Sequence, residues 1–268
     1  MALGAARKRN ARLHAQLRVA AAFAGFLLFW EVAVRVFGLP EYILPAPSRI
    51  FSAAAERWRS LLDASMFTVQ PMVLGFVLAV VLGVAIALGI AFSDAARQIA
   101  YPLLVFLQIV PKIAIAPLFI IWFGFGFTPK VLLVFLLSFF PIVVSSIAGF
   151  KSADRDVMDF ARTTGAGGLR LFVKISLPQA LPHIFTGLKV GAALAATAAV
   201  VAEFVASDKG LGYLLLQYNG QLDTPMVFAT IVILSLIGLA VYYVVEIVER
   251  IAIPWHVSQQ ATARDATM

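Results

Sequence analysis

The chain has 268 residues, of which 62% are hydrophobic and 13% charged, far from the roughly 45–50% and 25% of soluble domains. Its formal net charge is +7, which in so apolar a chain indicates basic loops on one membrane face rather than nucleic-acid binding. The absence of cysteine excludes a disulfide framework, a thiolate metal site and a cysteine nucleophile, and the apolar runs predict an all-α membrane protein with six transmembrane helices.

Residues 1–18 form a basic arm, and the first span is predicted over residues 19–37. A cleaved signal peptide is the alternative, but the apolar run is long and no small-residue cleavage site follows it. Glu31 and Arg35 are four residues apart on one helical face, in the favourable acidic-first order. Either they neutralise each other near the outer end, which we prefer, or they act in transport.

Residues 38–67 are expected to be a loop, because LPEYILPAPSRI contains three prolines that prevent a continuous helix. Ser48 is predicted to cap a short amphipathic helix within this loop. That helix would carry Ile50, Phe51, Ala54, Trp58 and Leu61.

The second span is predicted over residues 69–92, where Gly75, Gly83 and Gly89 favour close approach of neighbouring helices. The third is predicted over residues 101–123. Pro111, Lys112 and Pro117 interrupt it, so it should be kinked or broken.

The second half of the chain continues the pattern of apolar runs. We predict a fourth span over 131–150, with Pro141 in its middle, and a fifth over 184–206. A loop over 207–225 and a sixth span over 226–248 follow. A polar tail begins at Glu249, and its residues 251–268 are treated as a separate region.

The kinked third span and the alanine-rich fifth span are the best candidates to line a translocation path. The residues singled out there are Gln108, Pro111, Lys112 and Glu203. Lys112 should lie near mid-membrane, where an unpaired charge is costly. Three roles are open to Lys112: it attracts an anionic substrate, it neutralises Glu203, or it reaches a loop. We prefer its pairing with Glu203.

Residues 154–178 are a long charged, amphipathic insert between two spans. Asp154 is a candidate N-cap, and Val157, Phe160 and Ala161 share one face of a short helix. Glycines 165, 167 and 168 break the run, and a second short helix with Leu169, Phe172 and Val173 on one side is predicted to stop at Pro178. The insert is either a docking surface for a soluble partner or an ordinary surface loop.

Lysine and arginine are about twice as frequent on the side that carries the N-terminus, if the spans alternate as predicted. This asymmetry favours cytoplasmic N- and C-termini, with the arm 1–18, the tail 251–268 and the insert in the cytoplasm.

Sequence motifs for catalysis and metal binding are missing. There is no GxxxxGK[ST] loop, no GxSxG element and no HExxH spacing, and the three histidines lie far apart. We therefore expect no catalytic residue, no metal and no ATP hydrolysis in this chain. Isolated membrane carboxylates keep a secondary transporter or channel as an alternative, and a membrane scaffold is a third.

The insert resembles the EAA signature of permease subunits of binding-protein-dependent ABC importers. The pattern, allowing Asp for Glu and Phe for the first Ala, is Asp159-Phe160-Ala161-x3-Gly165-x9-Ile175-x-Leu177-Pro178. The similarity extends from about Leu44 to Arg250, through LPAPS, VPKIAIAPLFIIWFGFG, FFPIVVSS and VVAEF…GLGYLL. These stretches resemble the nitrate, sulfonate and taurine branch, whose relatives also serve thiamine-pyrimidine, riboflavin and aromatic carboxylate uptake.

The resemblance implies a MetI-like fold in the bacterial inner membrane, assembled as a homodimer with two ABC ATPase subunits and an extracytoplasmic binding protein. ATP and Mg²⁺ would be bound by the ATPase, with no cofactor in this chain. The EAA segment would be a coupling helix whose Asp159, Ala161 and Gly165 touch the ATPase, with Phe160 and Arg162 as neighbours. A sulfonate, taurine, nitrate or related organic anion is the first expected substrate, and a vitamin precursor or aromatic carboxylate the alternative.

Overall fold

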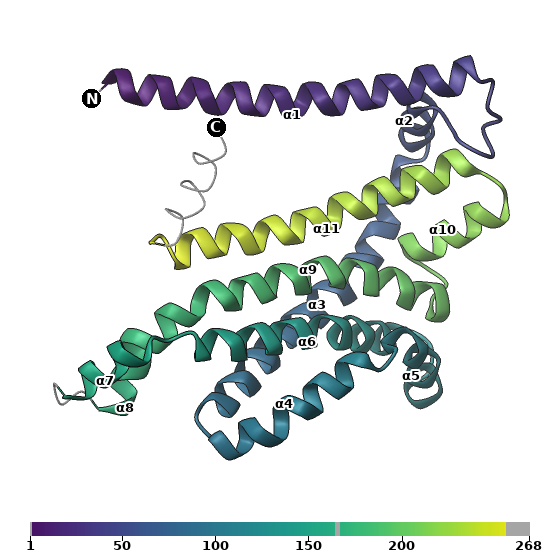
Figure 1. Ribbon diagram of the computed structural model, residues 1–268. Coiled ribbons are helices and arrows are strands. Elements are labelled where there is room, and N and C mark those ends of the chain that lie inside the picture. Colours follow the sequence, from purple (N-terminus) through teal and green to yellow (C-terminus); the bar gives the residue numbers. More distant parts are fainter. Residues whose placement is uncertain (1, 164–166, 256–268) are drawn as a thin grey trace. The chain divides into compact units, whose positions relative to one another are not determined.

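The computed structural model describes residues 2–163 and 167–255, in which every regular element is a helix (Figure 1). In chain order these elements are α1 (Ala2–Val36), α2 (Pro47–Glu56), α3 (Trp58–Ala91), α4 (Asp94–Ile109), η1 (Lys112–Ile115), α5 (Ala116–Phe123), α6 (Phe127–Lys151), α7 (Arg155–Thr163), α8 (Gly168–Leu171), η2 (Phe172–Ser176), α9 (Leu177–Ala206), α10 (Leu211–Gly220) and α11 (Thr224–Ala252).

Within the described residues, five stretches are long and apolar enough to cross a membrane. They are Leu17–Val36, Trp58–Ala91, Phe127–Lys151, Gly168–Val205 and Thr224–Ala252. A sixth span arises if the bent pair Gln98–Ile109 and Lys112–Phe123 is taken as one. The predicted all-α architecture with six spans is confirmed.

The third span is broken, as predicted, with a bend of 80°. The break lies at Pro111, which precedes η1 in an extended conformation, and a proline also disfavours helical geometry in the residue before it. Pro117 does not break the chain, because it occupies the first turn of α5, where a missing N–H has no partner to lose.

The chain divides into two compact units, one comprising Met1–Leu61 with Leu215–Val232 and the other Leu62–Leu214 with Ile233–Met268. In the first unit Glu31 pairs with Arg35, as preferred from the sequence, and also binds Ser48. The backbone N–H and Oγ of Ser48 lie 3.0 and 2.8 Å from the Glu31 carboxylate oxygens. The predicted capping role of Ser48 is wrong, because α2 begins at Pro47, a residue suited to a first helical turn.

The second span begins earlier than predicted, since α3 runs from Trp58 and not from residue 69. Trp58 and Leu61 therefore belong to α3 rather than to α2. The prediction placed the start at the onset of apolar sequence, whereas a helix continues into polar surroundings when its residues favour it.

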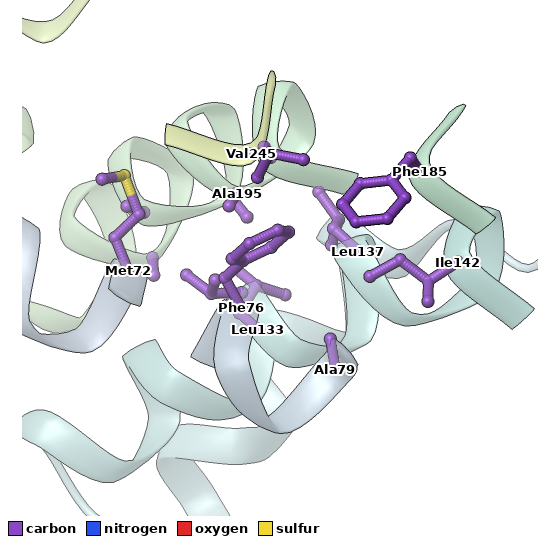
Figure 2. Close-up of a cluster of buried hydrophobic side chains, with 14 of the residues drawn as sticks. Met72, Phe76, Ala79, Leu133, Leu137, Ile142, Phe185, Ala195 and Val245 are labelled. Carbon is purple, nitrogen blue, oxygen red and sulfur yellow. The ribbon is translucent and has the colours of Figure 1, made fainter. Parts of the chain in front are cut away.

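The core of the second unit is formed by α3, α6 and α9, together with the later part of α11 (Figure 2). Small residues produce this packing. A Cβ added at Gly75 would lie 2.6 Å from the Val131 carbonyl oxygen, and one at Gly83 would lie 3.1 Å from the Ile142 side chain. Gly89 has no such neighbour within 4 Å, so two of the three predicted contact glycines are confirmed.

Two further boundaries differ from the prediction. The expected loop 207–225 contains the helix α10, and α11 extends to Ala252, so the polar tail does not begin at Glu249. The sequence of α10, LGYLLLQYNG, has glycine at its second and last positions, which masked its helical character.

Candidate functional site

The segment between α6 and α9 begins with a well-defined helix start. The backbone N–H of Asp156 donates to Oδ1 of Asp154 at 2.9 Å, which confirms Asp154 as the N-cap of α7. The N–H of Asp154 in turn lies 3.3 Å from Oε1 of Gln179, at the start of α9. The cap therefore ties α7 to the helix that follows the segment.

Helix α7 has a sheltered side and an exposed side. Met158 and Ala161 are partly buried, and Met158 Sδ accepts a hydrogen bond from Ser176 Oγ at 3.7 Å. Val157 and Phe160 are 42% and 72% exposed. Val157 and Phe160, three residues apart, together expose apolar surface on one side of α7, and contiguous apolar surface of this kind marks interaction sites.

The charged residues of α7 lie beside this exposed ring. Arg162 forms an ion pair with Asp159 at 3.0 Å, and both side chains are largely exposed. Because solvent screens such a pair, it contributes little to stability and leaves both groups available to a partner.

The second half of the segment does not stop at Pro178, contrary to the prediction. Helix α8 passes through the π-helical turn η2 directly into α9, and the N–H of Leu177 donates to the carbonyl of Phe172, five residues back. The wider turn accommodates Pro178 in the first turn of α9, where its missing N–H is tolerated.

The base of the segment is anchored to neighbouring helices of the second unit by aromatic contacts. The ring of Phe172 lies 5.0 Å from that of Phe92 and 5.9 Å from that of Phe150, measured between centroids. Leu171 is 5% exposed, whereas Leu169 and Val173 are 76% and 51% exposed. Figure 1 shows α7 and α8 together at one end of the paired helices α6 and α9.

The predicted coupling residues Asp159, Phe160, Ala161 and Arg162 thus lie on one short, anchored helix. Gly165 lies outside the described residues. Ala161 is more sheltered than its neighbours, so the face it shares with Val157 and Phe160 is only partly exposed.

The proposed path residues do not form one cluster. Gln108 and Pro111 are exposed, and the Nζ of Lys112 donates to the Gln108 carbonyl at 2.7 Å and lies 4.8 Å from the centre of the Phe140 ring. The preferred pairing of Lys112 with Glu203 is therefore wrong.

Glu203 binds neighbours from other elements. Its Oε2 accepts hydrogen bonds from the N–H of Gly212 at 2.6 Å and from Oγ1 of Thr68 at 3.1 Å. The carboxylate is 1% exposed. The sequence could not show these contacts. Thr68 lies 135 residues from Glu203, and a turn separates Gly212 from it.

The first unit holds a pocket of about 420 Å³ lined by α2, the segments on either side of it, the turn between α10 and α11, and the start of α11. Arg49 pairs with Glu41 at 2.9 Å, and Arg57 pairs with Asp223 at 2.9 Å. A hydrogen bond with Tyr218, followed by the Asp223 carboxylate, raises the pKa of Arg57 above its ordinary value. Both arginines stay charged.

Comparison with known proteins places residues 75–252 in the family described as binding-protein-dependent transport system inner membrane component. These residues include α6, α7, α8 and α9.

Three relatives resemble the chain along most of its length. The formylaminopyrimidine transport permease protein ThiX of Halalkalibacterium halodurans is 36% identical, covering 88% of this chain and 95% of the relative. The riboflavin transport system permease protein RibX of Chloroflexus aurantiacus is 35% identical over 87% of each. The taurine transport system permease protein TauC of Escherichia coli is 29% identical, over 85% of this chain and 86% of the relative.

A solved structure of an amino acid ABC transporter with histidines has the same fold. It matches with a TM-score of 0.60 at 17% identity, covering 75% of this chain and 97% of the other. At this identity the likeness concerns the fold, which is that of ABC importer permeases.

Proposed function

This chain belongs to the family of binding-protein-dependent transport system inner membrane components, the ABC importer permeases, and on that premise we propose that α7 docks a separate ABC ATPase. The six spans then form the path of a small solute, and the ATPase supplies the free energy. We further propose that ATP and Mg²⁺ bind to the ATPase alone.

The observation that carries this proposal is the anchored, exposed face of α7. Phe160 is 72% exposed, although the helix beneath it is held by the Asp154 cap and by the Met158 contact with Ser176. A rigid support converts movement of a docked partner into movement of the attached spans, whereas a loose loop would absorb it.

The remaining partners are proposed by analogy with the family. They are a second copy of this chain, a second ATPase subunit and an extracytoplasmic binding protein that delivers the solute. The excess of lysine and arginine beside the N-terminus supports cytoplasmic termini and a cytoplasmic α7. The pocket between Arg49 and Asp223 then faces the side from which the binding protein approaches.

For the substrate we now favour a small nitrogen heterocycle. The relatives at 36% and 35% identity bear names of formylaminopyrimidine and riboflavin permeases, and the taurine permease is 29% identical. An organic anion such as a sulfonate is the second candidate. Binding measurements on the cognate binding protein, with one compound of each class, decide between them.

The test of docking is co-purification of an ABC ATPase with the wild-type chain and with Phe160→Ala. Truncating an aromatic hot spot typically costs about 2 kcal/mol or more, which is roughly 30-fold in affinity. Phe125→Ala is the matched control, because Phe125 is 79% exposed and lies outside the segment. We expect the ATPase to be lost from Phe160→Ala and from Asp159→Lys but retained by Phe125→Ala.

Two results would contradict the proposal. One is an ATPase that remains bound to both α7 variants as tightly as to the wild type. The other is uphill uptake by the purified chain in vesicles without any ATPase, which would indicate a secondary transporter.

A further inference from the structure

The exposed segment and the fifth span are parts of one helical run. Residues Gly168–Val205 form a continuous stretch of 38 residues through α8, η2 and α9. At 1.5 Å per residue this run is about 55 Å long. Because α9 crosses the membrane, its C-terminal end lies on the face opposite α7.

A buried cap joins that far end to α10. Two backbone N–H groups in the first turn of α10 find side-chain acceptors, that of Gly212 on Glu203 Oε2 at 2.6 Å and that of Leu211 on Thr68 Oγ1 at 2.8 Å. The Thr68 hydroxyl itself donates toward Glu203 Oε2 at 3.1 Å and toward the Ala64 carbonyl at 3.2 Å. One carboxylate and one hydroxyl therefore link α9, α3 and the start of α10.

Glycines make room for this cap. Gly210 has a φ of +110°, which favours glycine, and a Cβ there would collide with the Glu203 carboxylate. A Cβ at Gly212 would lie 2.8 Å from the Cβ of Glu203. Glycine at both positions therefore leaves the space that the Glu203 side chain occupies.

The cap is buried and lies close to a lysine. Glu203 and Thr68 are 1% and 0% exposed, and Glu203 Oε1 has no hydrogen-bond partner among the described residues. The nearby cation is Lys130 on α6, which is 7% exposed, interacts electrostatically with Glu203 and donates to Ser207 Oγ at 2.5 Å. Separating these groups would leave a buried carboxyl group and two amides without hydrogen bonds, which is costly, so the cap favours joint movement of α9 and α10.

We propose that Glu203 and Thr68 are positioning residues that transmit displacement of the α7–α8 segment, through α9, to α10 on the opposite face. This inference rests on the proposed function, because the displacement comes from the docked ATPase. It replaces the expectation that Glu203 lines the translocation path.

The test uses the absence of cysteine from this chain. Asn219→Cys places one thiol at an exposed position of α10, and its rate of labelling by a maleimide is measured in the complex with the ATPase. The rates without nucleotide and with ATP and vanadate are compared. In the otherwise wild-type complex we expect the two rates to differ severalfold.

Thr68→Val is the principal variant, since it keeps the shape of the side chain and removes the hydroxyl. We expect it to lose the nucleotide-dependent difference at Asn219→Cys while ATP hydrolysis continues, and we expect Thr68→Ser to restore the difference. Thr230→Val is the matched control, because Thr230 is also 0% exposed but its hydroxyl donates to the Met226 carbonyl of its own helix, at 2.8 Å. It should retain the difference.

Glu203→Gln serves as the second variant if Thr68→Val does not fold. A nucleotide-dependent difference that persists in the folded variants would overturn the inference, as would its absence from the otherwise wild-type complex. In either case, continued ATPase binding and solute uptake would leave the proposed function intact. Failure of the wild-type chain to bind any ATPase would refute that function instead, and this inference with it.

Discussion

Close packing of α3 against α6 at Gly75 leads to a sharp prediction about stability. Gly75→Ala would place a Cβ 2.6 Å from the Val131 carbonyl oxygen and 2.7 Å from the Val134 Cβ. Neither atom belongs to the far end of a flexible side chain, so the two helices must separate locally.

The distance by which the two helices must separate sets the size of the destabilisation. Carbon atoms pack best at about 3.5 Å or more, so a contact of 2.7 Å must open by about 0.8 Å. A gap of this size forfeits roughly a quarter to a half of the dispersion energy of the atoms that line it. Met72 and Phe76 pack in the same core as Val134, and overfilled cores typically lose about 1–3 kcal/mol.

Thermal unfolding of the detergent-solubilised protein measures this cost. At about 2–4 °C per kcal/mol, Gly75→Ala should lower the melting temperature by roughly 2–12 °C. Gly89→Ala is the matched control on the same helix, because its added Cβ meets no described atom within 4 Å and gains up to about 1 kcal/mol of helix propensity. Equal melting temperatures for the two variants would refute the reasoning.

Two further predictions concern charges within the spans. Lys189 on α9 pairs with Glu249 on α11, and both side chains are largely buried, at 14% and 11% exposed. Lys189→Met should therefore lower the free energy of unfolding by about 3–5 kcal/mol and reduce the yield of folded protein. Adding Glu249→Gln should recover most of that yield, and equal yields from the single and double variants would contradict this prediction. Lys112 contacts the Gln108 carbonyl and not Glu203. The losses of uptake caused by Lys112→Met and Glu203→Gln should therefore add in the double variant. Higher uptake by the double variant than by either single variant would show instead that the two side chains interact.

The long apolar runs made most of the fold predictable, and proline chemistry gave the break in the third span. Helix limits were less predictable, because composition marks where lipid-compatible sequence begins and not where hydrogen bonding ends. Trp58 opens α3 well before the apolar run, and α10 forms from a sequence whose glycines suggested a loop.

The candidate site was also predictable only in part. Asp154 could be identified as a cap from local sequence, since its acceptor and the amide of Asp156 are two residues apart. The role of Glu203 could not, because Thr68 lies 135 residues away and only the packing of α3 against α9 brings them together. The pairing assigned to Lys112 failed for the same reason, as helical position alone does not specify a neighbour.

The π-helical turn η2 gives the junction between the proposed docking surface and the fifth span an unusual geometric property. It holds one residue more than an α-helical turn would, and each residue corresponds to about 100° of rotation about a helix axis. Removing Val173 and so restoring ordinary winding would rotate Leu169 by about that angle relative to the fifth span, while the sequence of α7 stays unchanged. The orientation of the proposed docking surface about the axis of the fifth span is thus set by a single additional residue.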